Sequence, residues 1–215
     1  YDTFVKEGTN YIADDITAEK CKLVENTSRD VDIAYANELS MICNTLGIDV
    51  FKLIELANKH PRVNILNPGV GVGGHCIAVD PWFLVERFPK DAKLIHEARK
   101  RNDSKPHWVA DKVEEEINKD RNLTIGILGL AYKPNVDDLR ESPSIELAHT
   151  LQERGYKVVG CEPYSEDKVV QDIKNLSLEE ILKEADYLVL TLAHEEFKKD
   201  IDKIMKKKVF NCIGL

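Results

Sequence analysis

Apolar residues recur at helical spacing through the first half of the chain. Between residues 18 and 46 they keep to one side of a helix, which predicts one long amphipathic helix that ends at Gly47. Its apolar stripe comprises Leu23, Val24, Thr27, Val31, Ala34, Ile42 and Leu46. The same spacing predicts helices over 49–59, 80–88, 91–101 and 104–119. We therefore expect an all-helical domain over residues 1–120, whose last helix connects it to the remainder.

The pattern changes after residue 121, where short apolar runs alternate with helical segments. A helix is expected over 143–154, and the strand-length runs are 123–130, 156–161, 187–192 and 208–212. This alternation predicts right-handed crossovers and a Rossmann-like parallel sheet with helices on both faces, over residues 121–215. Such sheets bind ligands at the carboxyl ends of their strands, which places residues 130–140 and Glu162 at the mouth of a pocket.

Composition narrows the possible functions. The chain has 215 residues, 43% of them apolar, and its net charge of -8 argues against nucleic-acid binding. No window is long and apolar enough to span a bilayer. Five widely spaced cysteines without a CxxC pair indicate reduced thiols in a cytoplasm, not a disulfide framework or a zinc site. Because the chain opens on Tyr1 without an initiator Met, we expect it to be a fragment.

The most distinctive segment is a glycine-rich loop at residues 68–76, PGVGVGGHC, which ends in a single thiol. Glycines let a backbone approach a ligand closely and direct successive amides at an anion. Asp80 before Pro81 predicts a helix start, with Asp80 as its cap. Cys76 is therefore either an exposed nucleophile or a buried apolar residue. A hydrolase built on Cys76 and His75 is disfavoured, because adjacent side chains rarely aim at each other.

The predicted sheet domain lacks the usual dinucleotide fingerprint. Gly126 and Gly129 do not form a G-x-G-x-x-G turn, and Gly126 lies inside the expected strand. Glu162 follows the second strand, where a ribose-binding acid would lie, and a solvated strand end explains it equally well. The sequence thus predicts a nucleotide-type fold without the pyrophosphate turn.

The first predicted helix also carries a polar stripe. Lys22, Asn26 and Arg29 stand at i, i+4 and i+7, opposite the apolar stripe and without an acid among them. An ammonium, a carboxamide and a guanidinium side by side suit a polarised oxygen or a phosphate. The alternative interpretation is an ordinary solvated helix face.

Several motifs in order resemble the UDP-glucose/GDP-mannose dehydrogenase family. They are AEKCKLVENT at 18–27, NEL at 37–39, HPRVN at 60–64, PGVGVGGHCIAVDPWFL at 68–84 and GLAYKPNVDDLRESPS at 129–144. The HPRVN and GGHCIAVDPWF forms are most similar to the branch that oxidises UDP-N-acetyl-D-mannosamine. The resemblance implies a helical dimerisation domain followed by a UDP-binding domain. The family's N-terminal NAD-binding domain has no counterpart in these residues.

The resemblance implies two successive oxidations of a sugar C6 alcohol to a carboxylate, with NAD as the cofactor. Cys76 matches the family nucleophile, which forms a thiohemiacetal and then a thioester. Lys22 and Asn26 match residues that hold the C6 oxygen and the water. Asp80 matches an acid that assists proton transfer. A chain without the NAD domain is expected to be inactive alone.

The resemblance also implies contacts with the substrate and the cofactor. Substrate binding is expected from Lys22, Asn26, Arg29, His60, Arg62, Gly73, Tyr132 and Lys133. His60 and Arg62 would reach a neighbouring subunit's site, so a homodimer or a higher homo-oligomer is expected. Arg140 would contact NAD. The chain departs from the family pattern at its end, where Asn211 replaces an expected Asp and Ile213 lies near an expected Arg.

The sequence leaves the function open among a few classes. The resemblance favours a cytoplasmic UDP-N-acetyl-D-mannosamine dehydrogenase that serves polysaccharide synthesis. A dehydrogenase of UDP-glucose or UDP-N-acetylglucosamine is the first alternative, because one sequence does not reveal a hydroxyl epimer. A non-catalytic UDP-sugar-binding module is the second. None of these readings requires a metal, a membrane or a nucleic acid.

Overall fold

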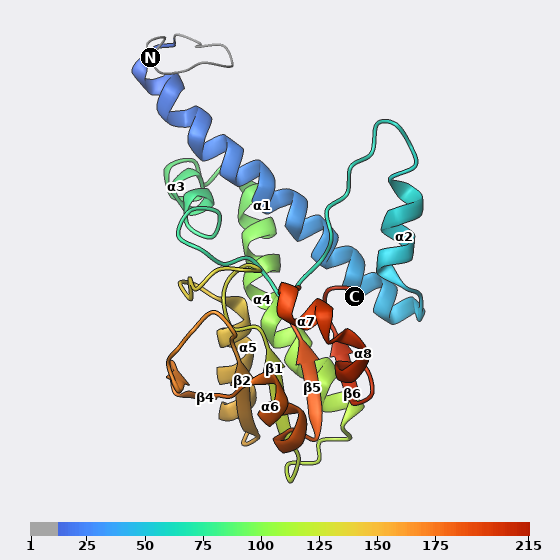
Figure 1. The fold of residues 1–215 in the computed structure, drawn as a ribbon. Helices are drawn as coiled ribbons and strands as arrows, with labels where there is room; N and C mark the ends of the chain where they lie inside the picture. The colour runs from blue at the N-terminus through green and yellow to red at the C-terminus, as the bar shows by residue number, and fades with distance from the viewer. Residues whose placement is uncertain (1–12) are drawn as a thin grey trace.

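The computed structural model describes residues 13–215; residues 1–12, which begin the predicted helical domain, lie outside the described part. The long helix α1 (Asp15–Leu46) crosses the upper part of the molecule and α4 (Lys93–Glu116) descends from it beside the sheet (Figure 1). Gly47 ends α1 in the left-handed region with φ 66°, as predicted. Two shorter helices, α2 (Val50–Ala57) and α3 (Asp80–Arg87), flank α1.

The prediction of separate helices over 91–101 and 104–119 is wrong, because α4 is continuous. Pro106 lies inside α4 and is buried, although it lacks the N–H that the Asn102 carbonyl would accept. Buried positions continue on both sides of the proline, among them Asn102 and Val109. Packing against α1 and the sheet therefore carries the helix through a residue that would end it in isolation.

The predicted apolar face of α1 is also partly wrong. Val24 and Leu46 are 56% and 65% exposed, whereas Asn26 and Asn37 are buried. The buried side of α1 faces α4 and is largely polar, because a hydrogen-bond network joins the two helices. Residues 13–215 leave the apolar edge of α1 uncovered.

That network centres on a buried ion pair. Arg99 of α4 donates to Asp30 of α1, and both side chains are fully buried. Asn102 Nδ2 donates to the same Asp30 oxygen at 2.8 Å, and Asn102 Oδ1 accepts from Asn37 Nδ2 at 2.9 Å. Polar groups removed from water in this way require partners, and the two helices supply them to each other.

The second half forms a six-stranded sheet in the order β3-β4-β2-β1-β5-β6. Its strands are β1 (Thr124–Leu128), β2 (Lys157–Cys161), β3 (Val169–Val170), β4 (Ile173–Asn175), β5 (Tyr187–Leu190) and β6 (Lys208–Asn211). The predicted parallel sheet is confirmed for every pairing except β3 with β4, which is antiparallel. Sequence analysis missed this hairpin because strands of two and three residues are too short to show a hydrophobic period.

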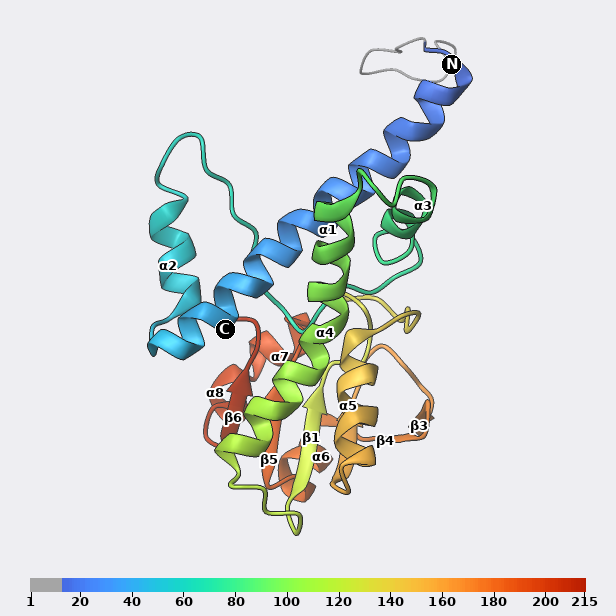
Figure 2. The ribbon, with the colours of Figure 1, turned by 180° about the vertical axis from the view of Figure 1, so that it is seen from behind.

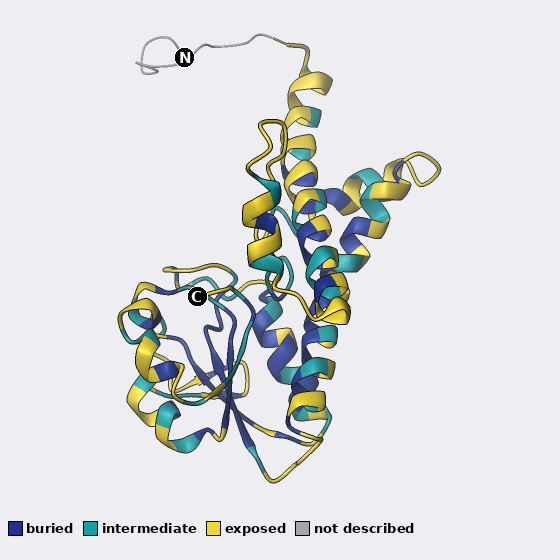
Figure 3. Ribbon diagram, turned by 90° about the vertical axis from the view of Figure 1, so that its right-hand side faces the viewer, coloured by how far each residue is buried: buried dark blue, intermediate teal, exposed yellow. Residues whose placement is uncertain are grey.

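Helices cover both faces of the sheet, as predicted. Seen from behind, α4 and α5 (Pro143–Glu153) lie over one face (Figure 2). The other face carries α6 (Leu178–Glu184), α7 (Glu195–Lys199) and α8 (Ile201–Ile204). Each face has its own apolar core, and burial is concentrated on the strands (Figure 3). No helix of residues 13–215 is long and apolar enough to cross a membrane.

Candidate functional site

The glycine-rich loop lies between the helical half and the sheet half and is held by both. The Gly69 amide donates to Asn37 Oδ1 of α1 at 2.9 Å. The Gly74 amide donates to the Arg140 carbonyl, in the loop after β1, at 3.0 Å. The segment that leads to Cys76 is thus anchored at one end by each half of the chain.

The glycines allow close packing between two loops. A Cβ on Gly73 would lie 2.3 Å from the Glu141 carbonyl oxygen, and one on Gly74 would lie 2.8 Å from the Tyr132 ring. Gly74 also has a positive φ of 84°. We expected these glycines to bring the backbone to a ligand. In the structure they bring it against residues 132–143, and the Gly74 amide is already bonded to protein.

Gly73→Ala is therefore expected to lower the free energy of unfolding by about 1–3 kcal/mol, the usual cost of overpacking. The added methyl would meet the Glu141 backbone, which cannot rotate away as a flexible side chain would. Gly69→Ala is the matched control, because a Cβ there meets nothing within 4 Å. Urea denaturation compares the two. Equal stabilities would contradict the close packing.

Cys76 is half-buried and lies in the turn before α3. Its carbonyl accepts the amides of Val79 at 3.1 Å and Asp80 at 2.8 Å. The N-cap of α3 is Val79, without a side-chain cap bond, so the prediction that Asp80 caps this helix is wrong. The Asp80 carboxylate instead accepts from Asn26 Nδ2 at 2.5 Å, across from α1. Two predicted catalytic residues 54 positions apart thus meet beside the loop of the third.

The three residues of the predicted polar stripe on α1 lie in different environments. Asn26 is buried against Asp80, whereas Lys22 and Arg29 are exposed. Lys22 Nζ lies 3.4 Å from Glu25 Oε2, a partner that the stripe analysis left out. This pair is exposed on both sides, so an incoming anion would compete with it easily.

Residues after β1 form the other side of the loop contact. Arg140 donates two hydrogen bonds to the Asp138 carboxylate, from Nε to Oδ1 at 2.9 Å and from Nη2 to Oδ2 at 2.6 Å. These hydrogen bonds lower the pKa of Asp138 to about 2 and raise that of Arg140. Lys133 is exposed, with Nζ 5.4 Å from the Tyr132 ring centroid. The predicted phosphate- and NAD-contacting cations therefore lie on one loop, and one of them is already paired.

Glu162 is neither a solvated strand end nor free to bind a ribose. It is buried, and one carboxylate oxygen accepts the amides of Leu130 at 2.7 Å and Ala131 at 2.8 Å. His194 Nε2 lies 3.3 Å from the same oxygen. Burial raises the pKa of Glu162, but the His194 contact and the two amides outweigh it and lower that pKa. Glu162 fixes the turn after β1, a role that sequence reasoning missed because His194 comes 32 residues later in the chain.

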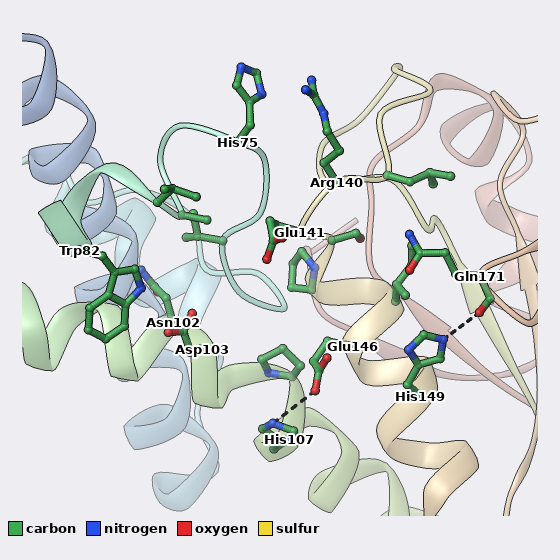
Figure 4. Close-up of a pocket in the computed structure, with 18 residues that line it drawn as sticks. His75, Trp82, Asn102, Asp103, His107, Arg140, Glu141, Glu146, His149 and Gln171 are labelled. Atoms are coloured by element: carbon green, nitrogen blue, oxygen red, sulfur yellow. Dashed lines mark hydrogen bonds and ion pairs between the residues drawn. The ribbon is translucent and has the colours of Figure 1, made fainter.

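A cavity of about 950 Å³ opens between α3, α4, α5 and the glycine-rich loop (Figure 4). Of the predicted site residues, all within the described range, Arg140 alone lines it. Its other polar lining includes two groups that sequence analysis missed, His107 with Glu146, 3.6 Å apart, and His149, whose Nε2 bonds the Gln171 carbonyl at 2.8 Å. In the sequence, the one pattern that could have indicated these residues is the i, i+3 spacing of Glu146 and His149, which places both on one face of a helix.

Two predicted residues lie elsewhere. His60 and Arg62 are exposed on the loop that projects beyond α2, across α1 from α3 (Figure 1). The chain itself does not bring them to Cys76, and their role in a neighbouring subunit stays a prediction. Residues 13–215 contain no group of three His, Cys, Asp or Glu side chains arranged to hold a metal.

Both halves of the chain, the helical one and the sheet one, are similar to known proteins. The central domain of the UDP-glucose/GDP-mannose dehydrogenase family matches residues 16–104, and its UDP binding domain matches residues 126–213. The chain is 47% identical to an NDP-N-acetyl-D-galactosaminuronic acid dehydrogenase from Ralstonia nicotianae, over 100% of this chain and 52% of that protein. It is 48% identical to a UDP-N-acetyl-D-mannosamine dehydrogenase from Methanocaldococcus jannaschii, over 100% of this chain and 50% of that protein.

A solved structure of a relative has the same fold over nearly the whole chain. The UDP-D-ManNAc dehydrogenase from Pyrococcus horikoshii superposes with a TM-score of 0.86 at 37% identity, over 99% of this chain and 51% of that one. The chain spans about half the length of the curated relatives it matches.

Proposed function

Because the chain belongs to the UDP-glucose/GDP-mannose dehydrogenase family, we propose that it is the central and UDP-binding part of an NAD-dependent UDP-sugar 6-dehydrogenase. The favoured substrate is UDP-N-acetyl-D-mannosamine, which names several of the relatives. The observation that carries the proposal is the 2.5 Å contact between Asn26 and Asp80, beside the turn that holds Cys76. It joins predicted catalytic groups from two helices.

In this mechanism the C6 alcohol first loses a hydride and its hydroxyl proton, which leaves an aldehyde. The Cys76 thiolate attacks the aldehyde carbon, and with one proton the adduct is a thiohemiacetal. Loss of a second hydride and of the hydroxyl proton gives a thioester, and attack by water releases the carboxylate and a proton and regenerates the thiol. The chemistry that NAD supplies when bound is acceptance of the hydride lost from C6 in each oxidation.

The chain's own residues would stabilise charge and position water. The Asn26 amide has a second N–H, besides the one given to Asp80, for an oxygen on C6. Lys22 would add a positive charge, since its Glu25 contact is exposed and weak. Asp80, ordered by Asn26, would take a proton from the attacking water.

The residues of this chain would provide only part of an NAD-binding site. Arg140 is the residue of this chain that would contact it, through a guanidinium now held by Asp138. Residues 69–74 (GVGVGG) match the letters G-x-G-x-x-G, but they follow α2 and not a strand, so they are not the dinucleotide-binding turn of a βαβ unit. We infer that the rest of the cofactor site comes from sequence outside the 215 residues. The 215 residues alone would then bind substrate without turning it over.

We also propose that the protein forms a homodimer. The uncovered apolar edge of α1, with Val24, Ile42 and Leu46 about half exposed or more, suits a second copy. The loop with His60 and Arg62 would then reach the partner's site. All five cysteines are free, in keeping with a reduced cytoplasm. Uronate production would serve polysaccharide synthesis.

A second sugar is a specific alternative. The Ralstonia relative is named for N-acetyl-D-galactosaminuronic acid and is about as similar as the mannosamine dehydrogenases. A UDP-N-acetylhexosamine of the galacto configuration is therefore the second candidate substrate, and the two differ in hydroxyl orientation.

Calorimetric titration of the chain tests these assignments. We expect saturable binding of UDP-N-acetyl-D-mannosamine and UDP, weaker binding of UDP-glucose, and none of NAD. Lys133→Met is expected to weaken UDP binding about tenfold or more, the scale of a lost charge-assisted hydrogen bond. Lys183→Met, an exposed lysine on α6, is the matched control. If no UDP compound binds, or if both variants bind alike, the phosphate assignment is wrong.

A further inference from the structure

Lys105 is a buried cation that has no acidic partner among residues 13–215. It is 2% exposed, and its Nζ donates to Ser40 Oγ at 2.5 Å. The Trp108 ring centroid lies 3.8 Å from the same nitrogen. Among the described residues no carboxylate oxygen comes within 4.0 Å of it. The other buried cation of α4, Arg99, by contrast contacts both Asp30 and Asp103. A buried charge normally has such a counterion.

The Lys105 side chain lines a second cavity of about 210 Å³. This cavity lies where the C-terminal half of α1, the start of α2, α4 and the end of β6 meet, beside the last residue of the chain (Figure 1). Its walls are mostly apolar and aromatic, with Ile48, Val50, Phe51, Trp108, Val109 and Phe210. The one acidic side chain in its lining, Asp49, is exposed and accepts the amides of Phe51 and Lys52 as the cap of α2.

We propose that this cavity binds a small organic carboxylate, with the carboxylate on Lys105 Nζ and the apolar body against Trp108 and the phenylalanines. Its volume is below the range of pockets for drug-sized ligands, so it is too small for a nucleotide sugar. It touches the glycine-rich loop only at Pro68 and Gly69, and neither Cys76 nor the phosphate-assigned Lys133 lines it, so it is distinct from the proposed UDP-sugar site.

The donor set favours a carboxylate over a phosphate. A dianionic phosphate is usually held by several charged or backbone donors. Among the described residues Lys105 is the only cation in the lining, and Asn44 adds a neutral side-chain amide. The Ser40 hydroxyl accepts from Lys105 and donates to the Asn37 carbonyl at 2.6 Å, so it has no hydrogen left for a ligand. Asn211 is largely used within the chain, since its Nδ2 gives one N–H to the Leu215 carbonyl and its Oδ1 accepts the amides of Ile213 and Gly214. One neutral N–H remains on this amide. One positive charge with flat apolar walls matches a monoanion such as an aromatic acid.

Binding should weaken as the pH rises. Burial lowers the pKa of Lys105 to about 8, and only its ammonium form attracts a carboxylate. The other titratable or charged groups around it are Cys43 of α1, Asp49 before α2, Arg101 of α4 and Cys212 after β6. Burial raises the pKa of Cys43, and raises that of Cys212 to about 12, so both thiols stay neutral. Lys105 is thus the group that titrates in this cavity near pH 8.

Benzoate is the probe, and Trp108 fluorescence reports its binding in a Trp82→Phe background, since the chain has two tryptophans. We expect a saturable change whose affinity falls about tenfold between pH 7 and pH 9, the ratio of ammonium populations for a pKa near 8. Lys105→Met is expected to weaken binding at least tenfold. Lys100→Met, which removes an exposed lysine of α4 that pairs with Glu97, is the matched control and should bind as the parent does.

Three results would overturn the proposal: no saturable signal with the parent, equal affinity in Lys105→Met, or inorganic phosphate binding as tightly as benzoate. If Lys105→Met fails to fold, the parent's pH dependence decides, because an affinity that is constant from pH 7 to pH 9 excludes Lys105 as the anchor. UDP titration of the same protein is independent of these outcomes, so failure here leaves the proposed dehydrogenase function standing.

Discussion

Replacing Cys76 with serine is expected to abolish NADH formation by the whole enzyme that contains this chain. The proposed mechanism passes through a thiohemiacetal and a thioester, and a serine hydroxyl is a far weaker nucleophile than a thiolate. Loss of a catalytic nucleophile typically lowers kcat by several orders of magnitude, about 10⁴ or more. Steady-state NADH absorbance with UDP-N-acetyl-D-mannosamine measures the effect.

Cys21→Ser is the matched control for this variant. Its thiol is exposed on α1, so the same chemical change there should leave turnover near the parent rate. UDP affinity of Cys76→Ser, measured in parallel, should also be near the parent value, because serine preserves the shape of the turn before α3. Turnover of Cys76→Ser close to the parent rate would rule out covalent catalysis at this position.

Arg99→Met is expected to lower the free energy of unfolding by about 3–5 kcal/mol, the usual cost of removing one partner of a buried ion pair. The substitution would leave the Asp30 carboxylate fully buried with Asn102 as its remaining side-chain donor. The second oxygen of Asp30 already has no partner within the described residues. Chemical denaturation at pH 7 measures the loss.

Arg101→Met is a matched control two residues along the same helix. Arg101 pairs with Glu38 of α1 at 2.9 Å, but both side chains are substantially exposed, so its loss should cost no more than about 1 kcal/mol. A comparable loss in both variants would mean that burial of the Asp30–Arg99 pair is not the cause of the lowered free energy of unfolding.

The pH dependence of Arg99→Met gives a second check. Burial raises the pKa of Asp30 even with Arg99 present, and removing Arg99 should raise it further. A carboxyl with a raised native pKa binds its proton more tightly when folded, so its protonation stabilises the native state as the pH falls. The deficit of Arg99→Met should therefore shrink between pH 7 and pH 5. A constant deficit would show that Asp30 stays charged in the folded variant down to pH 5, so that its pKa is not raised into this range.

The sequence by itself determined the elements and the family. Helical spacing and the Gly47 stop located α1, and alternation of apolar runs with helical segments predicted the parallel sheet, because these signals lie in neighbouring residues. The ordered motifs identified the family, which the matches to both domains confirm. The roles of Cys76, Lys22 and the other site residues stay predictions.

Only the tertiary structure decided which polar residues are buried and with whom. Asn26 and Asp80 are 54 residues apart, and Glu162 and His194 are 32 apart, so no local period links them. The same holds for Gly73 against the Glu141 carbonyl and for Lys105 in its cavity. Hydrophobic spacing records which residues avoid water within one element. It carries no information on which partner satisfies a buried polar group, because that partner comes from another element brought close by the fold.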